Sequence, residues 1–210
     1  MKRVSLILGV VLVCQLPALA QIRFSFGALG GVRLSRGAPA GYHDESRRYT
    51  LGPAFEVSFG EHLAAEVDAL YKRFGYSDFF ALNSGLPDNI PVAYDLARGR
   101  SHSVEIPVLG KYYFGARSSP GRFFVATGYS FQRSWTSSTS EVLQTSPYAT
   151  IESAIIGGSV PTEVGAAFGA GWARKKGPLT FQPAFRYTHW GARFDAASRN
   201  QLEILLGLWF

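Results

Sequence analysis

Acidic and basic side chains recur at every second position in several stretches of this sequence. Glu66 and Asp68 are two residues apart, and Lys72 follows with the same parity. Such side chains share one face of an extended strand, because successive residues point to opposite faces. The charged residues that we predict to share the interior face of one sheet are Arg23, Arg33, Glu56, Glu66, Asp68, Lys72, Glu105, Lys111, Glu163, Arg186 and Glu203.

Two kinds of chemistry fit this charge cluster. Mixed charges can neutralise each other as buried ion pairs, and pairing is the favoured interpretation because an unpaired buried charge is costly. Arg186 and Glu203 lie on consecutive predicted strands with matching parity, so we predict that they pair. The alternative is a cation path lined by Glu66, Asp68 and Glu105.

A catalytic reading centres on His189. The closing run Arg186-Tyr187-Thr188-His189 weakly resembles the lipid A deacylase family, whose barrels place a histidine, a nearby serine and a glutamate on late strands. Thr188-His189 fits the approach to that motif, but Gly191 stands where the serine is expected. Glycine offers no nucleophile for acyl transfer. We therefore expect that the protein is not an enzyme, with lipid A modification as the least favoured alternative.

Other site classes find little support in the sequence. It contains no phosphate-binding loop, no metal-spaced His/Cys set and no EF-hand pattern, so we expect no cofactor and no metal. The net charge is +6, and it falls to about +4 without Lys2 and Arg3. The basic residues are scattered and not gathered on one element, so we expect no nucleic-acid partner.

Alternation of apolar and polar residues predicts the elements that hold these side chains. Eight segments show it, and no later apolar run is long enough for a membrane helix. Aromatic residues near the segment ends are typical of interfacial girdles: Phe24, Phe59, Phe114, Phe123, Trp172 and Phe210. The predicted fold is all-β, an eight-stranded antiparallel up-and-down transmembrane β-barrel, with strands at 22–34, 49–59, 62–74, 101–114, 122–133, 161–173, 178–190 and 200–210.

The connections support a membrane barrel over a soluble lipocalin-like barrel, which also has eight strands. Short connections at 60–61, 115–121 and 174–177 alternate with long ones at 35–48, 75–100, 134–160 and 191–199. Short periplasmic turns and long extracellular loops have this rhythm. Pro53 has no N–H, so we predict a local pairing defect at that position.

The first twenty residues read as a secretory signal peptide. Lys2 and Arg3 precede an apolar stretch over 4–19, and Ala18-Leu19-Ala20 is a small-x-small cleavage site. The predicted division is a signal peptide at 1–20 and a barrel domain at 21–210. Cys14, the only cysteine, would leave with the signal, so the mature chain would have no disulfide.

The last strand resembles the C-terminal assembly signal of bacterial outer-membrane barrels. In that signal an aromatic last residue follows alternating apolar positions. We expect it to engage the outer-membrane assembly machinery through Leu202, Ile204, Leu206, Leu208 and Phe210.

With the signal peptide, the eight strands, the loop rhythm and the run Arg186-Tyr187-Thr188-His189-Trp190-Gly191, the mature chain resembles the small OmpA-like outer-membrane β-barrel family. The resemblance implies an integral protein of the cell outer membrane with a narrow or plugged lumen and long extracellular loops. Envelope structure or surface interaction would be its role, and a small passive porin-like channel for ions or small solutes is the alternative. Its expected partners are outer-membrane lipid, lipopolysaccharide and an unknown ligand at the loops.

Overall fold

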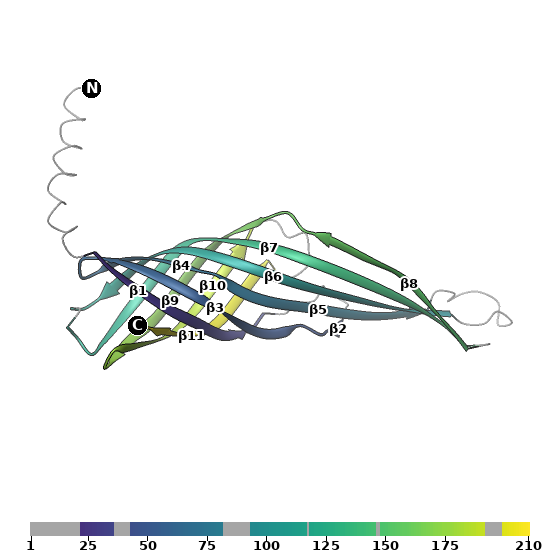
Figure 1. The fold of residues 1–210 in the computed structure, drawn as a ribbon, viewed down its shortest axis with the longest axis horizontal. Helices are drawn as coiled ribbons and strands as arrows, with labels where there is room; N and C mark the ends of the chain where they lie inside the picture. The colour runs from purple at the N-terminus through teal and green to yellow at the C-terminus, as the bar shows by residue number, and fades with distance from the viewer. Residues whose placement is uncertain (1–21, 36–42, 82–92, 117, 146–147, 192–198) are drawn as a thin grey trace, which may run out of the picture.

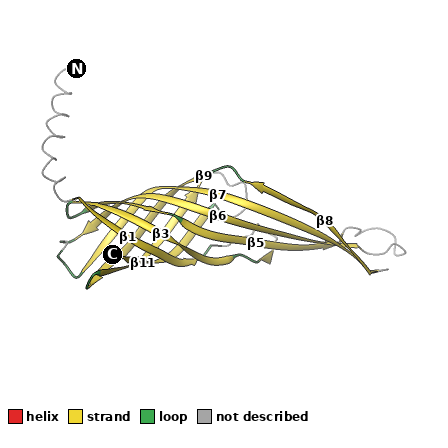
Figure 2. Cartoon of the chain, viewed as in Figure 1, coloured by secondary structure: helices red, strands yellow, loops and turns green. Residues whose placement is uncertain are grey.

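The computed structural model describes residues 22–35, 43–81, 93–116, 118–145, 148–191 and 199–210. The predicted signal peptide at 1–20 and its cleavage site lie outside the described residues. Within the described ranges the regular structure consists of strands (Figure 2). No helix among these residues has the length and apolar character needed to cross a membrane.

Eleven strand segments follow one another in the described chain, and every pairing between them is antiparallel. Their bounds are β1 (Ile22–Arg33), β2 (His43–Asp44), β3 (Arg47–Phe59), β4 (Leu63–Asp68), β5 (Leu70–Ala81), β6 (Ala93–Phe114), β7 (Gly121–Thr145), β8 (Tyr148–Ser159), β9 (Glu163–Lys176), β10 (Leu179–Trp190) and β11 (Asn200–Trp209).

These segments make eight barrel strands, as predicted. Three barrel strands carry a break, and they consist of β2 with β3, β4 with β5, and β8 with β9. Neighbours in the described barrel are consecutive along the chain except at one seam, where β1 pairs with β11 and closes the sheet. At this seam Gly27 faces Trp209 and Gly31 faces Leu205.

The seam is packed tightly around its glycines. A Cβ added to Gly27 would lie 2.4 Å from the carbonyl oxygen of Leu208, and one added to Gly31 would lie 2.2 Å from that of Ile204. Both distances are far shorter than a normal van der Waals contact, so the two strands meet without room for a side chain there.

Pro53 produces the pairing defect that its chemistry predicts. Its carbonyl accepts a hydrogen bond from the backbone N–H of Ala69 at 3.0 Å. Proline has no N–H to return the bond, and the strand assignment breaks at Ala69, between β4 and β5. The Ala69 carbonyl oxygen turns toward Gly52, where an added Cβ would be only 1.8 Å away.

Each of the three short turns contains one glycine with a left-handed backbone. Gly60, Gly115 and Gly177 have φ values of 69°, 90° and 64°. They connect β3 to β4, β6 to β7 and β9 to β10. Glycine adopts positive φ without steric cost, so these residues allow tight reversals at one end of the barrel, the end at which β1 begins and β11 ends (Figure 1).

The opposite end is more ordered than the sequence pattern predicts. Parts of the predicted connections 75–100 and 134–160 are strand, because β5, β6, β7 and β8 continue through them. β6 has 22 residues and β7 has 25, whereas crossing a membrane takes about 9–11. These four strands therefore extend as a sheet well beyond the rest of the barrel (Figure 1).

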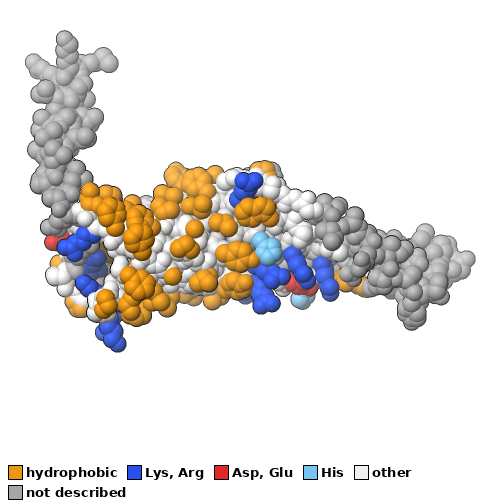
Figure 3. Space-filling model, in the orientation of Figure 1, with side chains coloured by type: hydrophobic (Ala, Val, Ile, Leu, Met, Phe, Trp, Pro, Cys, Tyr) orange, Lys and Arg blue, Asp and Glu red, His pale blue; other side chains and the backbone are white. Residues whose placement is uncertain are grey.

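The described barrel is apolar outside and polar inside. Large exposed apolar side chains cover its middle, and all six predicted girdle aromatics are exposed, from 38% at Phe59 to 74% at Phe210. Figure 3 shows this apolar surface, with basic side chains at both of its ends. The small apolar clusters of the interior include Leu29, Leu70 and Trp209. Further apolar clusters lie around Phe124 and Leu109, and buried polar and charged side chains lie between the clusters.

Candidate functional site in the barrel lumen

Ten of the eleven charged residues predicted to face the interior are buried in it. They are Arg33, Glu56, Glu66, Asp68, Lys72, Glu105, Lys111, Glu163, Arg186 and Glu203. Arg23 differs: it is exposed and lines the cavity at the barrel end where β1 begins. Arg23 has the parity of an interior residue. Its position near the start of β1 places it at the open end of the barrel, so it does not belong to the buried cluster.

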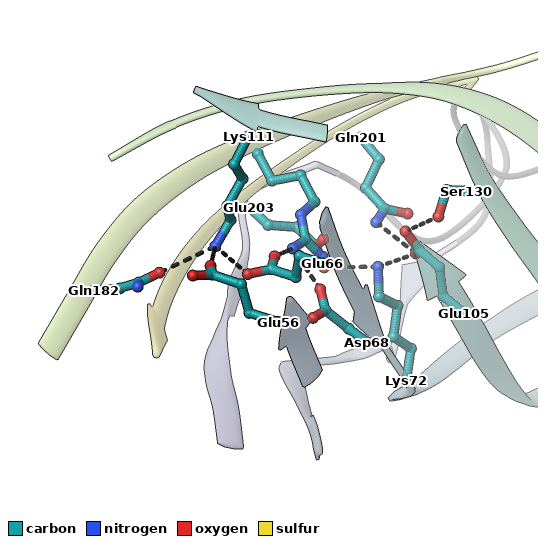
Figure 4. Close-up of polar contacts among 11 residues, drawn as sticks. Glu56, Glu66, Asp68, Lys72, Glu105, Lys111, Ser130, Gln182, Gln201 and Glu203 are labelled. Carbon is teal, nitrogen blue, oxygen red and sulfur yellow. Dashed lines mark hydrogen bonds and ion pairs between the residues drawn. The ribbon is translucent and has the colours of Figure 1, made fainter. Parts of the chain in front are cut away.

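Lys111 is the centre of a first group of contacts, nearest the short turns. Its Nζ atom lies 3.0 Å from Oε2 of Glu56, donates to Oε1 of Gln182 at 3.1 Å and forms an ion pair with Glu66. The hydroxyl of Tyr113 donates to Glu56 at 2.7 Å and accepts a hydrogen bond from Gln182 at 3.2 Å. The ammonium group of Lys111 therefore has three side-chain oxygen partners, which come from β3, β4 and β10 (Figure 4).

Arg186 continues the contacts across the lumen. Its Nη2 atom lies 3.2 Å from Oε1 of Glu66 and 2.6 Å from Oδ2 of Asp68. Glu66 is thereby shared between Lys111 and Arg186, since its two carboxylate oxygens each contact a different cation. The result is a continuous chain of ion pairs that runs through Glu56, Lys111, Glu66, Arg186 and Asp68.

Lys72 forms a second group, further toward the projecting strands. It is paired with Glu105, and its Nζ atom lies 2.8 Å from Oε1 of Glu203. Ser130 donates to Glu105 at 2.5 Å, and Gln201 donates to it at 3.3 Å. This group joins β5, β6, β7 and β11 around one buried ammonium.

The prediction that Arg186 pairs with Glu203 is wrong about the partner. The two residues are direct cross-strand neighbours in the register of β10 and β11. Arg186 nevertheless extends to Glu66 and Asp68 on β4, and Glu203 lies against Lys72 on β5. Across a narrow lumen the long inward side chains reach the opposite wall, so strand adjacency alone does not determine the ion pairs.

Arg33 and Glu163 complete the buried set near the outer part of the lumen. The guanidinium of Arg33 lies 3.9 Å from the centre of the Phe74 ring, which is a cation–π distance. Glu163 is buried at the start of β9, where it faces Gln132 on β7. Charge near this end is thus placed against an aromatic ring and opposite an amide side chain.

Two cavities lined by described residues differ greatly in size along the lumen. A vestibule of about 560 Å³ opens at the end with the short turns, and Arg23, Glu61, Arg122 and Lys175 are among its lining residues. Beside Lys111 and Arg186 the remaining cavity is about 20 Å³, which is close to the space that one water needs. The ion-pair chain therefore lies where the lumen leaves room for about one water.

The family of the chain follows from comparison with known proteins. A family model described as an outer membrane protein beta-barrel domain matches residues 15–191, which is most of the sequence. The chain belongs to this outer membrane β-barrel family. No curated protein matches the sequence significantly.

Several solved structures are similar to this member of the outer membrane β-barrel family. They include the N-terminal barrel domain of OprF from Pseudomonas aeruginosa (12% identity, 90% of this chain and 98% of that chain, TM-score 0.47). OprG from the same organism aligns with 12% identity over 90% and 94% of the two chains, with a TM-score of 0.44. Ail, the attachment invasion locus protein of Yersinia pestis, aligns with 9% identity over 90% and 95%, with a TM-score of 0.43.

His189, the residue considered for catalysis, lies on the outer face of this outer membrane barrel. Its Nδ1 atom is 2.8 Å from Oδ1 of Asn200, which also accepts a hydrogen bond from Tyr187 at 2.8 Å. This arrangement is an exposed polar contact between β10 and β11. Among the described residues, no group of three or more His, Cys, Asp or Glu side chains is placed to hold a metal ion.

The five residues of the predicted assembly signal all face outward. Leu202, Ile204, Leu206 and Leu208 are exposed on β11, and Phe210 follows the strand. The intervening Gln201, Glu203, Leu205 and Trp209 are buried inside the barrel. The last strand thus presents a continuous apolar face to its surroundings and a mixed face to the lumen.

Proposed function

We propose that this protein is a non-enzymatic, integral outer-membrane barrel whose lumen is closed to solutes and whose role is envelope structure or surface interaction. The chain of ion pairs through Glu56, Lys111, Glu66, Arg186 and Asp68 is the observation that carries the proposal. It spans the lumen where the remaining cavity is about 20 Å³, and an eight-stranded barrel has an interior only wide enough for side chains.

The energetics of the network favour a lumen that stays closed. An ion that passed Lys111 or Arg186 would have to displace partners that neutralise these cations. Separating a buried ion pair costs several kcal/mol, because both charges are already removed from water. The second group around Lys72 adds a further barrier on the same path.

The projecting sheet of β5, β6, β7 and β8 supports a role at the surface. In a barrel of this type the short turns face the periplasm and the long connections face outward. The sheet would then stand above the membrane, where it can contact an extracellular ligand. We propose that export uses the signal peptide at 1–20 and that the assembly machinery engages β11.

Single-channel recording in a planar bilayer tests the closed lumen. Insertion is checked separately by the heat-dependent gel mobility of the folded barrel. Inserted wild-type protein should give no discrete current steps. A Lys111→Ala/Arg186→Ala variant that still inserts should pass ions, because it removes the two cations that hold the chain together. Discrete, salt-dependent steps from the wild type would overturn the proposal.

A small pore that prefers cations is the second candidate. The excess of acidic over basic side chains in the interior would favour cations over anions. The buried residues in the described part of the chain include six Asp and Glu side chains and four Lys and Arg side chains. If wild-type protein conducts, the reversal potential in a salt gradient should show cation preference.

Unchanged lipid A mass spectra in cells with and without the protein would argue against the enzymatic alternative.

A further inference from the structure

The outer surface carries a group of basic side chains next to the apolar band. We call the arginine patch the set formed by five arginines and one histidine on β3, β5, β6 and β7. All six side chains face outward, and all but the half-buried Arg73 are exposed. Figure 3 shows basic and histidine side chains, with an acidic side chain among them, gathered where the apolar surface ends and the projecting sheet begins. The members are Arg47, Arg73, Arg98, Arg100, His102 and Arg133.

The height of the patch follows from β6. Its outward apolar positions run from Val104 to Phe114. About ten residue steps of roughly 3.4 Å, tilted by about 40°, span roughly 26 Å. That matches the height of about 25 Å expected for the apolar band of an outer-membrane barrel. His102, Arg100 and Arg98 come next on the same face, so they lie at the level of the lipid headgroups.

The register brings the members of the patch together. Arg47 on β3 is opposite Arg73 on β5, and Arg73 is opposite His102 on β6. Arg100 and Arg98 lie one and two outward positions beyond His102 on the same strand. Like charges directly opposite each other on neighbouring strands are destabilising. A bound anion would remove that penalty for the pair Arg47 and Arg73.

A pocket within the patch has the donors that an anion needs. Arg98 and Arg100 on β6 and Ser137 and Thr139 on β7 line a cavity of about 200 Å³. Arg98 is opposite Thr139 and Arg100 is opposite Ser137, so each arginine has a hydroxyl residue as its cross-strand neighbour. Guanidinium groups bind phosphate oxygens through paired N–H donors, and hydroxyl groups add single hydrogen bonds.

Positive charge outnumbers negative charge around the patch. Within the described residues, none of the five arginines forms an ion pair with an Asp or Glu side chain. Glu45 lies against Gly75, and Gly75 is opposite Arg100. Glu141 on β7 is opposite Leu96, one outward position beyond Arg98. Five arginines beside these two acidic residues leave a net positive surface.

We propose that the arginine patch binds the phosphate groups of lipid headgroups in the outer leaflet of the membrane. The patch is continuous with the lipid-facing band, and Tyr71 and Trp135 lie within it: Tyr71 contacts His102, and the Arg133 guanidinium lies 5.8 Å from the Trp135 ring centre. Amphipathic aromatic side chains are typical of the headgroup level. This inference rests on the proposed location in the outer membrane, but it is independent of whether the lumen conducts.

Lipid binding by refolded full-length barrel in detergent tests the proposal, with native mass spectrometry as the readout. The probes are bisphosphorylated lipid A, the same lipid without its phosphates, and inorganic phosphate. Wild type should bind the bisphosphorylated lipid at least about tenfold more tightly than the dephosphorylated form. Arg98→Gln/Arg100→Gln should weaken that binding by about 10- to 30-fold, as expected for two arginines near an anionic headgroup.

Lys175→Gln/Lys176→Gln is the matched control, because it removes the same charge from exposed positions at the opposite end of the barrel. It should leave lipid binding unchanged. Equal loss in both variants would show general electrostatic attraction and overturn the site. Equal binding of the two lipids, or competition by millimolar inorganic phosphate as strong as by lipid, would also overturn a headgroup site. Heat-dependent gel mobility confirms that each variant is folded, and a conducting barrel that binds lipid as expected would overturn only the closed lumen.

Discussion

Arg186 on β10 lies 2.6 Å from Asp68 on β4, although its neighbour in the sheet register is Glu203. Three barrel strands, β3, β1 and β11, separate β4 from β10 around the wall. The contact therefore connects opposite sides of the barrel through its interior. Hydrogen bonds of the sheet hold each strand to its neighbours, and this ion pair holds the closed cylinder at a fixed width.

Replacing Asp68 by asparagine should destabilise the barrel strongly. The new amide would keep the shape of the side chain but leave Arg186 with only the carboxylate of Glu66, which is already shared with Lys111. Removing one partner of a buried ion pair typically costs about 3–5 kcal/mol. Urea unfolding in lipid vesicles, followed by tryptophan fluorescence, measures the change. Asp78→Asn, on a half-buried residue of the projecting part of β5, should change the free energy of unfolding by less than about 0.5 kcal/mol.

A double-mutant cycle should identify the partner of Glu203. Glu203→Gln should lower the unfolding midpoint because Lys72 loses one of its two carboxylates. Contacting residues show coupling energies of about 0.5–3 kcal/mol, so the coupling with Lys72→Gln should exceed that with Arg186→Gln. A larger coupling to Arg186 would contradict the ion pairs described above.

Gly52→Ala should disturb the barrel wall at Pro53. The added methyl group would meet the Ala69 carbonyl oxygen, which has no room to retreat because the backbone there is held by the hydrogen bond to Pro53. Overpacking of this kind costs about 1–3 kcal/mol. Gly30→Ala is the control, since its nearest neighbour would be a Leu51 methyl carbon at 3.5 Å. Equal stability of the two variants would refute the steric account.

Arginine substitutions along β11 should report depth in the membrane. Leu206 lies near the middle of the outward apolar positions on this strand, and Phe210 lies at their end. An outward arginine costs about 2–4 kcal/mol at the bilayer midplane and about 0–1 near the interface. Leu206→Arg should therefore be clearly less stable than Phe210→Arg in vesicle unfolding experiments. The reverse order would show that the band is positioned differently along the strand.

The barrel and the facing of its charges could be predicted because alternation is a local property. Where one face of a strand meets lipid and the other meets the lumen, the odd or even position of a residue along the strand determines its face. Lys72 and Glu105 are assigned to the lumen in this way. The pairing defect at Pro53 could also be predicted, because a residue without an N–H leaves one backbone hydrogen bond unmade in any strand. The hydrogen-bonding partners Gln182, Gln201 and Tyr113 share the interior parity too, but alternation does not say which charged residue each of them contacts.

Three features were missed for physical reasons. The outer parts of β5 to β8 lack apolar alternation, because water on both faces of the sheet requires no apolar side, so 75–100 and 134–160 read as connections. The partner of Arg186 depends on the reach of side chains across the lumen and not on adjacency. Arg23 has the correct parity, but its depth along the barrel places it in the vestibule.

The seam between β1 and β11 makes the barrel tolerant of longer loops but intolerant of larger side chains at the seam. It is the one pairing in the described barrel that joins distant parts of the chain, so it bears the entropy of closing a very long loop. That entropy grows only with the logarithm of length, and doubling a loop adds about 0.6 kcal/mol. Long insertions between strands should therefore leave closure almost unchanged. A single methyl group added at Gly27 or Gly31 would instead clash with the backbone of β11 and push the two strands apart. The barrel should therefore tolerate longer loops far better than larger side chains at the pairing of β1 with β11.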